Sequence, residues 1–353
     1  MLRLVDVAGV RSTMCTRTIW IIGSFKAWRA AACRRGYCIL AAALFVGSCL
    51  VPLAPAGAGL NEAFGAYLRG DKETSFREFL AMAQAGNPLA QYNLGVLYVS
   101  GDGVPENDVE AVMWYRRAAE GGHADAQFQL GAMYDRGEGV AKNEAEAAKW
   151  YRRAADQGDA AAQFSLGDMY SIGRGVAKDD AVAAMWYRRA AEQGNSSAQF
   201  HLGWAYYAGL GVPANYADSA EWYRRAADQG HPGAQNFLGL MYDTGEGVVE
   251  DDAEAVKWLL RAADQHYEVA FFNLGLMYVA GGGVPKDPIQ AHMWFNLAAA
   301  NMVPGAGRKQ AVANRMMIEA KLSSTEISRA QAMARNWQPK AKEVSDDAAG
   351  PAG

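Results

Sequence analysis

Apolar residues recur along the chain with the spacing of an α-helix. Ala126, Leu130, Met133 and Tyr134 stand at positions i, i+4, i+7 and i+8, which places them on one face of a helix and does not fit the alternation of a strand. After a glycine-containing turn, a second apolar stripe follows. The pattern therefore predicts two helices joined by a short connection.

The connection and the second helix carry their own boundary signals. Residues 137–140 read Gly-Glu-Gly-Val, and glycine lets the backbone adopt left-handed conformations at a helix end. Asn143 is suited to cap the second helix, whose buried stripe contains Ala147, Trp150 and Ala154. The glycine turn follows a helix and lacks the preceding strand and third glycine of a nucleotide-binding loop, which argues against a phosphate site.

The helix pair repeats every thirty-six residues, without a gap, from residue 88 to about 300. One tryptophan recurs in each copy, at Trp114, Trp150, Trp186, Trp222, Trp258 and Trp294. The predicted caps of the second helices are Asn107, Asn143, Asp179, Asn215, Asp251 and Asp287. Six copies in register predict an all-α repeat array of helix pairs.

A glycine stands inside the first helix of every copy, as Gly131 does in the second. Glycine in a helix interior costs roughly 1 kcal/mol relative to alanine, so its recurrence needs a packing reason. We expect a close approach of the second helix, at its alanine pair Ala154-Ala155, to supply that reason.

The two ends of the array differ from the regular copies. Residues 59–87 predict a degenerate helix pair that caps the amino-terminal end. In the last copies, Leu259 and Phe271 replace polar or amphipathic residues on a face expected to be solvated. We expect residues 301–340 to cover it with a helix that begins at Ser323 and runs to Trp337. Residues 341–353 are predicted to be a disordered tail.

Charge and cysteine content separate the amino terminus from the rest. Residues 1–58 have a net charge of +6 and the 353-residue chain has −4, so residues 59–353 have −10. All four cysteines lie before residue 59, and the repeats therefore hold no disulfide framework, thiolate nucleophile or cysteine metal ligand.

The first 58 residues predict a secretory signal peptide. A basic segment precedes an apolar run over residues 36–46, and small residues at A-x-A spacing end it, with cleavage expected after Ala58 or Ala56. The basic segment is long, so translation could begin downstream of Met1. We expect a periplasmic or secreted protein.

Three other interpretations of this segment stay open. Residues 37–54 could form an uncleaved anchor, although Pro52 and Pro55 interrupt the apolar run. Residues 46–49 are similar to a loose bacterial lipobox, which would place a lipid on Cys49. Arg34-Arg35 faintly resembles a twin-arginine signal. A membrane is therefore expected to be reached only through the amino terminus.

Paired arginines recur in the second helix, as at Arg116-Arg117. The first arginine of each pair stands four residues before a carboxylate, Glu120 in this copy, so we expect ion pairs along a solvated helix face. Because residues 59–353 are acidic, the pairs do not predict a nucleic-acid surface.

No catalytic or metal-binding group emerges from the residue spacing. The histidines are His123, His201, His231, His266 and His292, and none stands at metal-ligand spacing with another histidine or a cysteine. The sequence therefore predicts a non-enzymatic protein without cofactor or metal.

Columns that vary within the constant framework are the candidates for recognition, since such positions are exposed on the concave surface of helical repeats. Trp204 lies outside the tryptophan column, with His201 and Tyr207 on the same side of its helix. It would anchor a peptide or protein partner, or fill space against the next copy. The candidate partner-binding residues are Asn93, Gln129, Asp168, His201, Trp204, Tyr207, Leu240 and Asn273.

The unit A-x-A-Q-[FY]-x-L-G-x-[ML]-Y-x-x-G-x-G-V…A-x-x-W-Y-R-R-A-A-x-Q-G, seen for instance over residues 124–158, resembles the Sel-1-like repeat family, a relative of the tetratricopeptide repeat. The resemblance implies a right-handed superhelical α-solenoid that assembles other proteins as an adaptor. Secreted members with paired cysteines in each repeat have been linked to β-lactam binding, and this chain has no cysteine in any repeat. We therefore expect an exported scaffold; a β-lactam or peptidoglycan binder or enzyme of the cell envelope, or a membrane-tethered scaffold, is the alternative.

Overall fold

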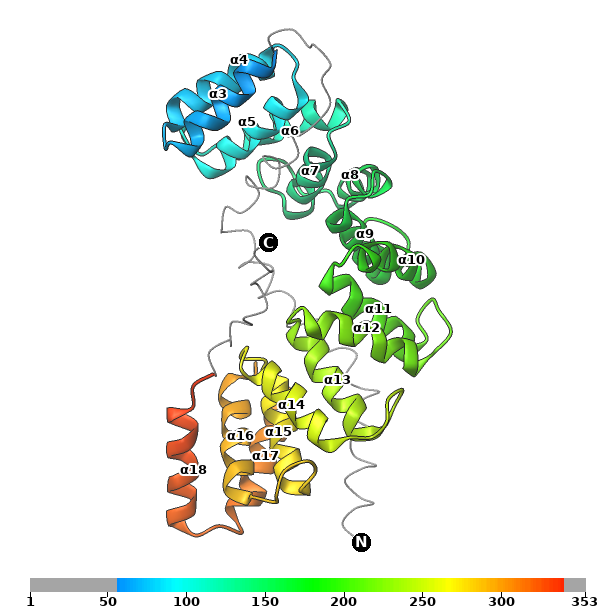
Figure 1. The fold of residues 1–353 in the computed structure, drawn as a ribbon, viewed down its shortest axis with the longest axis vertical. Coiled ribbons are helices and arrows are strands. Elements are labelled where there is room, and N and C mark those ends of the chain that lie inside the picture. Colours follow the sequence, from blue (N-terminus) through cyan, green and yellow to red (C-terminus); the bar gives the residue numbers. More distant parts are fainter. Residues whose placement is uncertain (1–55, 340–353) are drawn as a thin grey trace, which may run out of the picture. The chain divides into compact units, whose positions relative to one another are not determined.

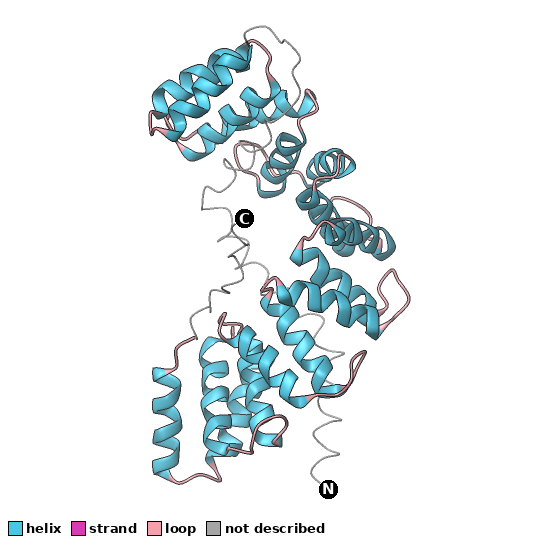
Figure 2. Ribbon diagram, viewed as in Figure 1, coloured by secondary structure: helices cyan, strands magenta, loops and turns pink. Residues whose placement is uncertain are grey.

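The computed structural model describes residues 56–339, which form sixteen α-helices and no β-strand (Figure 1, Figure 2). The helices are α3 (Ala56–Leu68), α4 (Lys72–Gln84), α5 (Pro88–Ser100), α6 (Asp108–Glu120), α7 (Ala124–Arg136), α8 (Glu144–Asp156), α9 (Ala160–Ile172), α10 (Asp180–Glu192), α11 (Ser196–Ala208), α12 (Tyr216–Asp228), α13 (Pro232–Thr244), α14 (Asp252–Ala263), α15 (Glu268–Ala280), α16 (Pro288–Asn301), α17 (Ala306–Glu319) and α18 (Ser324–Asn336). Successive helices pack against one another, so the prediction of an all-α repeat solenoid is confirmed. The predicted signal segment, apart from its last three residues, and the predicted tail lie outside the described residues.

Helix boundaries follow the predicted caps. Asn143 Oδ1 accepts a hydrogen bond from Glu146 N at 3.1 Å, and the other five predicted caps of the second helices make the same type of bond. At the end of the first helix, Gly137 has φ +77° and donates its N–H to Met133 O at 2.8 Å. The local sequence therefore fixes where each helix begins and ends.

In five of the six copies the glycine inside the first helix makes room for an aromatic ring, and in the fifth copy Gly239 makes room for Leu259. A Cβ on Gly131 would lie 2.8 Å from Cδ1 of Tyr151, and the next nearest residue is Ala147, whose carbonyl oxygen would lie at 3.3 Å. The expected packing reason is confirmed, but the expected partner, the pair Ala154-Ala155, is wrong. A ring lying across the first helix needs more room than a methyl group, and this explains why glycine is required.

The second glycine of each connection packs backbone against backbone between copies. Gly139 has φ +63°, and a Cβ there would lie 2.2 Å from the carbonyl oxygen of Asp108, the first residue of α6 in the preceding copy. The corresponding distance in the six copies is 2.0–2.2 Å. Each connection therefore rests on the previous helix pair and sets the distance between copies.

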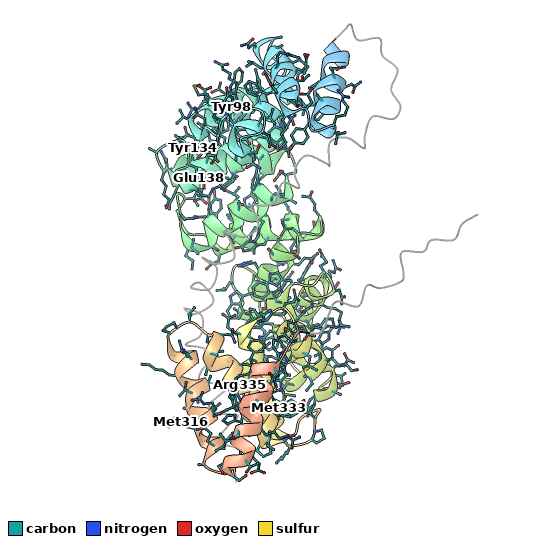
Figure 3. The ribbon with its side chains drawn as sticks, turned by 90° about the vertical axis from the view of Figure 1, so that its left-hand side faces the viewer. Tyr98, Tyr134, Glu138, Met316, Met333 and Arg335 are labelled. Carbon is teal, nitrogen blue, oxygen red and sulfur yellow. The ribbon has the colours of Figure 1, made fainter. Side chains whose placement is uncertain are left out.

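The first arginine of each pair bridges copies instead of forming the predicted ion pair. Arg116 Nη2 donates to the Tyr134 hydroxyl at 2.6 Å, and Arg152 bonds Tyr170 in the same way at 2.6 Å. Within the part of the chain that the structure describes, no ion pair joins Arg116 to Glu120, so that expectation is wrong. The guanidinium reaches the tyrosine hydroxyl and also makes a cation–π contact with its ring. An ion pair between exposed side chains contributes less to stability. Figure 3 labels Tyr134 and its counterpart Tyr98 in consecutive copies.

The second arginine of each pair covers its own tryptophan. The guanidinium carbon of Arg153 lies 4.4 Å from the centroid of the Trp150 ring. Arg117, Arg189, Arg225 and Arg261 lie over their tryptophans at 4.5–4.7 Å. These arginines shield the edge of the core while keeping their charge in water.

A column of buried glutamines connects successive copies. Gln127 Nε2 donates to Ala119 O at 3.0 Å, and its Oε1 accepts from Gln157 Nε2 at 2.7 Å. Gln127 is only 4 % exposed, so the expectation that this face is solvated is wrong. The amide satisfies a carbonyl at the end of the preceding helix, which explains why a polar residue is buried there.

The last copy replaces this glutamine with Phe271, and the carboxyl-terminal helix covers it as predicted. Helix α18 packs against α16, and the Trp337 ring lies 5.3 Å from Phe271 and 5.8 Å from Trp294. Ser323 and Glu326 form the predicted capping box at the start of α18. At the other end of the array, α3 and α4 pack through Phe64 and Phe79, whose ring centroids are 5.1 Å apart.

Candidate functional site

The predicted site residues differ in their exposure. Asn93 and Asn273 are only 8 % and 3 % exposed, so the expectation that they lie on an open surface is wrong. Their amides have partners inside the protein, since Asn93 Nδ2 donates to Leu89 O and Asn273 Nδ2 to Asn236 Oδ1, both at 2.8 Å. The other predicted residues are partly exposed: Gln129, Asp168, His201, Trp204, Tyr207 and Leu240.

Asp168 and His201 meet at Tyr187, a residue of α10 that sequence reasoning did not select. The Tyr187 hydroxyl donates to Asp168 Oδ1 at 2.9 Å, and the His201 ring stacks on the Tyr187 ring with centroids 5.1 Å apart. Burial lowers the pKa of His201, against the opposing effect of the Asp168 carboxylate, and burial raises the pKa of Tyr187. The imidazole and the phenol are therefore held in their neutral forms.

An aromatic surface surrounds Trp204 in the fourth copy. The Trp204 and Tyr207 rings stack with centroids 5.8 Å apart, and Phe237 of α13 meets Trp204 edge-on at 5.7 Å. Tyr216, at the start of α12, lies 5.2 Å from Tyr207 and is 44 % exposed. We call Trp204, Tyr207, Tyr216 and Phe237 the aromatic surface.

Tyr223 lies beneath the aromatic surface and was missed by sequence reasoning. Its side chain is 0 % exposed, its ring stacks on Phe237 at 5.3 Å, and its hydroxyl has no hydrogen-bond partner among the described residues. One copy earlier, Tyr187 donates to Asp168, and Trp204 holds the position of Asp168 in this copy. The repeat columns show this change in the sequence, because the fourth copy keeps the tyrosine and loses the aspartate that accepts its hydrogen bond.

A second variable pair of positions lies at the end of the first helix and in the connection one copy later, and in two copies a hydrogen bond joins them. In one pair, Arg174 Nη1 donates to Asp135 Oδ1 at 2.8 Å. Two copies further on, the Tyr207 hydroxyl donates to Glu246 Oε2 at 2.9 Å. In the copy after that, Asp243 holds the position of Asp135, and the position of Arg174 is a glycine, residue 282.

The Asp243 carboxylate is surrounded by negative charge. Burial raises its pKa to about 6, and the carboxylates of Asp252 and Glu250 act in the same direction. The Asp135 carboxylate in the equivalent position has the guanidinium of Arg174 beside it. Asp243 is therefore the member of this column whose charge is opposed by its surroundings.

Replacing Asp243 with asparagine is expected to stabilise the protein by about 1 kcal/mol at pH 7. The folded-state pKa of about 6 is above the ordinary aspartate value of 3.8, so the charged form is fully penalised above pH 6 and the gain from Asp243→Asn disappears as the pH falls below 4. Urea unfolding at pH 7 and pH 4 measures the difference. Asp135→Asn, which removes the partner of Arg174, is the control and should destabilise the protein; a loss of stability in both variants would contradict the assignment.

Two histidines cap first helices through neutral rings. His231 Nδ1 accepts from Ala234 N at 3.1 Å and its ring stacks on Phe200 at 4.7 Å, while His123 caps α7 in the same way. Burial lowers the pKa of His231 to about 4, and the nearby His201 adds to the effect. These contacts assign a structural role to His123 and His231.

Lowering the pH from 7 to 4 is expected to cost the protein roughly 2 kcal/mol through His231 alone. Its folded-state pKa of about 4 is below the ordinary histidine value of 6.5, so the unfolded chain takes up the proton first and stability falls as the pH drops from 6.5 to 4. His231→Asn keeps a capping group, as Asn195 does in the same column, and should remove this part of the pH dependence. Urea midpoints across the pH range test it, and parallel curves for the two proteins would refute it.

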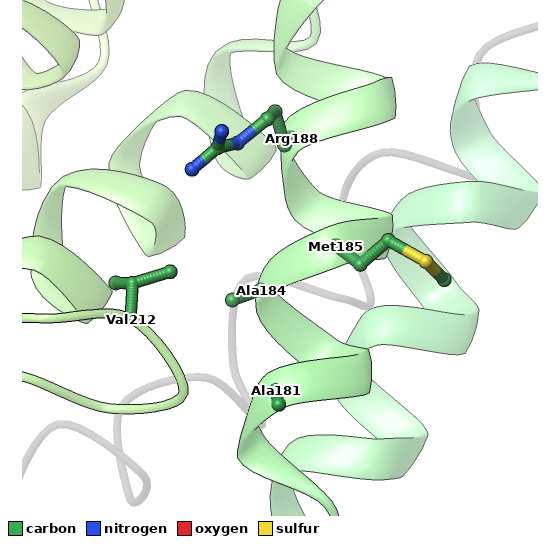
Figure 4. A pocket seen from close by; sticks show the side chains of 5 residues that line it. All are labelled: Ala181, Ala184, Met185, Arg188 and Val212. Atoms are coloured by element: carbon green, nitrogen blue, oxygen red, sulfur yellow. The ribbon is translucent and has the colours of Figure 1, made fainter.

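The hollow on α10 offers no reactive group. A hollow of about 230 Å³ beside α10 is lined by Ala181, Ala184, Met185, Arg188 and Val212, none of which is a nucleophile or general base (Figure 4). Among residues 56–339, no three His, Cys, Asp or Glu side chains are placed to hold a metal ion. No helix in the same residues is long and apolar enough to cross a membrane.

Comparison with known proteins identifies the repeat. The Sel1 repeat matches six segments, residues 88–123, 124–159, 160–195, 196–231, 232–267 and 270–301. The structure is similar to a Sel1 repeat protein from Oxalobacter formigenes, with 33 % identity, a TM-score of 0.61, and coverage of 70 % of this chain and 98 % of that one. It is also similar to c5321, a protective antigen of uropathogenic Escherichia coli with an SLR fold, with 27 % identity, a TM-score of 0.46, and coverage of 79 % and 82 %. No curated protein sequence matches the chain significantly. Six matched repeats in register show that the chain belongs to the Sel1 repeat family.

Proposed function

We propose that this protein is an exported, non-catalytic scaffold that binds a partner protein or peptide on the face carried by the first helices of its repeats. Sel1 repeat proteins are generally protein-interaction scaffolds. The aromatic surface is the observation that carries the proposal. Trp204 and Tyr207 are half-buried and Tyr216 is 44 % exposed, and large rings held rigidly by their neighbours are typical anchors of protein interfaces.

The alternative, a β-lactam or peptidoglycan binder or enzyme, requires a nucleophile and a base that act together. The group of Asp168, Tyr187 and His201 comes nearest to this arrangement. Burial opposes ionisation of the Tyr187 phenol, whose pKa is raised, and the ring of His201 stacks on the Tyr187 ring with an interplanar angle of 25°. These features favour a packing role and support a scaffold.

The proposed export rests on the order of basic, apolar and small residues before residue 59. A tether through residues 37–54 or a lipid on Cys49 would keep the same binding function but hold the protein at a membrane. Intact-mass analysis of the protein recovered from its native cells distinguishes the forms. Loss of the first 58 residues supports the soluble form, an acyl mass on Cys49 supports the lipidated one, and an unshortened chain rejects both.

Site-specific photocrosslinking in cells tests the binding surface. A photoreactive phenylalanine analogue replaces Trp204 in one variant and the exposed Arg153 of α8 in the other, and circular dichroism confirms that both variants fold. The proposal expects one distinct protein at position 204 that is absent at position 153 and that binds the purified wild-type protein. The same background at both positions would reject the aromatic surface as the binding site.

A further inference from the structure

The contact between Arg174 and Asp135 shows which group pairs with a carboxylate at the end of a first helix in this protein. The guanidinium of Arg174 donates to Asp135 Oδ1 at 2.8 Å, and the two side chains are only 18 % and 8 % exposed. The arginine comes from the connection one copy later. A carboxylate held in this place therefore binds a guanidinium group in a partly desolvated setting, where such pairs are strongest.

Three copies further on, the carboxylate is kept and the arginine is not. Asp243 occupies the position of Asp135, and Gly282 occupies the position of Arg174. The charged groups that influence Asp243 are Asp252, on the next helix, and Glu250, in the connection before it, and both are negative. The surface at this point has the charge that complements a basic side chain supplied from outside.

The aromatic surface borders this position. The Tyr207 hydroxyl donates to Glu246 Oε2 at 2.9 Å, and Glu246 lies three residues after Asp243. A Cβ on Gly247, the residue that follows, would lie 2.1 Å from the Tyr216 carbonyl oxygen, so the connection carrying Glu246 rests directly on α12. A carboxylate-bearing connection and aromatic rings thus lie against one another beside Asp243, and guanidinium groups bind both kinds of side chain.

A second observation concerns the aromatic surface itself. The Tyr223 hydroxyl is fully buried beneath the aromatic surface and has no hydrogen-bond partner among residues 56–339. Its counterpart Tyr187 donates to Asp168, whose position is taken by Trp204 in this copy. Buried polar groups are normally satisfied, so this copy gives up an internal hydrogen bond to place an aromatic ring at the position of Asp168.

We propose that the partner is recognised by an arginine side chain that pairs with Asp243, in the place that Arg174 fills beside Asp135, while flanking residues of the same segment contact the aromatic surface. This inference rests on the proposed scaffold function and names the chemistry of the partner. Trp204 and Tyr207 then provide apolar contact area, and Asp243 provides the specificity for a basic residue in the partner.

Titration with a pair of peptides tests the proposal on the full folded protein. The probe is an acetylated heptapeptide of leucine and alanine with one central arginine, and its control carries citrulline, which has the same shape and no charge. We expect the wild-type protein to bind the arginine peptide at least roughly tenfold more tightly, as measured by peptide fluorescence anisotropy. Equal affinity for the two peptides, or no binding of either, would overturn the proposal.

Three variants locate the binding site. Asp243→Asn removes the carboxylate, and Gly282→Arg supplies an internal guanidinium; both should reduce the affinity for the arginine peptide to that for the citrulline peptide. A Cβ on Gly282 would meet only the side-chain ends of Asp252 and Met277, at 3.0 and 3.2 Å, so the arginine can be accommodated. Glu138→Arg places the same charge at the equivalent connection opposite Val99, and it should leave the affinity unchanged. An arginine preference that survives in Asp243→Asn would refute the assignment.

The crosslinking experiment separates this inference from the proposed function. If a partner is captured through position 204 equally well in the wild-type and Asp243→Asn backgrounds, the scaffold function stands and the arginine proposal fails. If no partner is captured in either background, the proposed function fails as well.

Discussion

Replacing Gly211 with alanine is expected to destabilise the protein by roughly 3–4 kcal/mol, because two penalties add at this position. Gly211 has φ +70°, which disfavours any residue with a Cβ. The added Cβ would also lie 2.0 Å from the carbonyl oxygen of Asp180, which belongs to the backbone of α10 and cannot move aside without shifting the helix. Unfolding in urea, followed by circular dichroism, measures the loss.

Gly209 provides the matched control in the same connection. It has φ +68°, but its nearest neighbour to a new Cβ would be the side chain of Ala214 at 3.4 Å, an ordinary contact. Gly209→Ala should therefore cost only about 1–2 kcal/mol, the penalty of the left-handed conformation alone. Similar losses in the two variants would show that contact between copies does not determine the requirement for glycine at position 211.

The second large effect is expected at the carboxyl-terminal end of the array. Trp337→Ala should cost roughly 2–3 kcal/mol, since the ring contacts Phe271, Trp294 and His266 with centroids 5.3–5.8 Å apart. Stability in a repeat array is a sum over neighbouring copies, so uncovering the last copy should let it unfold before the others. We expect a separate early transition in urea, detected by amide hydrogen exchange in α15 and α16.

A smaller aromatic residue at the same position gives the comparison. Trp337→Phe keeps a ring against Phe271 and should retain most of the stability and a single transition. If Trp337→Ala unfolds at the same urea concentration as the wild-type protein, with unchanged exchange in α15 and α16, α18 does not act as a cap.

The sequence predicted the parts of the fold that depend on neighbouring residues. Caps such as Asn143 and Asp251 and helix-ending glycines such as Gly137 act within a few residues of the chain, so their signals are complete in a short segment. Each of these signals recurs in six copies, which makes the pattern easier to recognise. The covering role of α18 was also predictable, because Phe271 could not remain at a polar position without an apolar partner.

Contacts between copies could not be predicted in the same way. Arg116 had two candidate partners, a carboxylate on its own helix and Tyr134 eighteen residues away, and only the packing of the helices decides for the tyrosine. Asn273 stands in a variable column, but the partner that permits its burial, Asn236, belongs to the preceding copy. Variation in a column therefore indicates a changed contact in some copies and a partly exposed surface in others.

The aromatic surface shows the same limit. The position of Trp204 drew attention to the fourth copy, whereas Phe237, Tyr216 and the unpartnered Tyr223 join it from other helices. How much each ring contributes to the aromatic surface depends on how deeply it is buried in the folded protein, and the repeat pattern does not give this burial.

The contacts that join copies span constant distances along the chain, and this has a consequence for how such proteins change in evolution. Arg116 contacts a residue eighteen positions later and Gln127 one eight positions earlier, and each bond links one copy only to its neighbour. A recombination event that deletes or duplicates one whole unit therefore leaves every framework residue with a partner of the same kind. The array can therefore lengthen or shorten on either side of Trp204. The number of copies on each side then determines how far the aromatic surface lies from each end of the array.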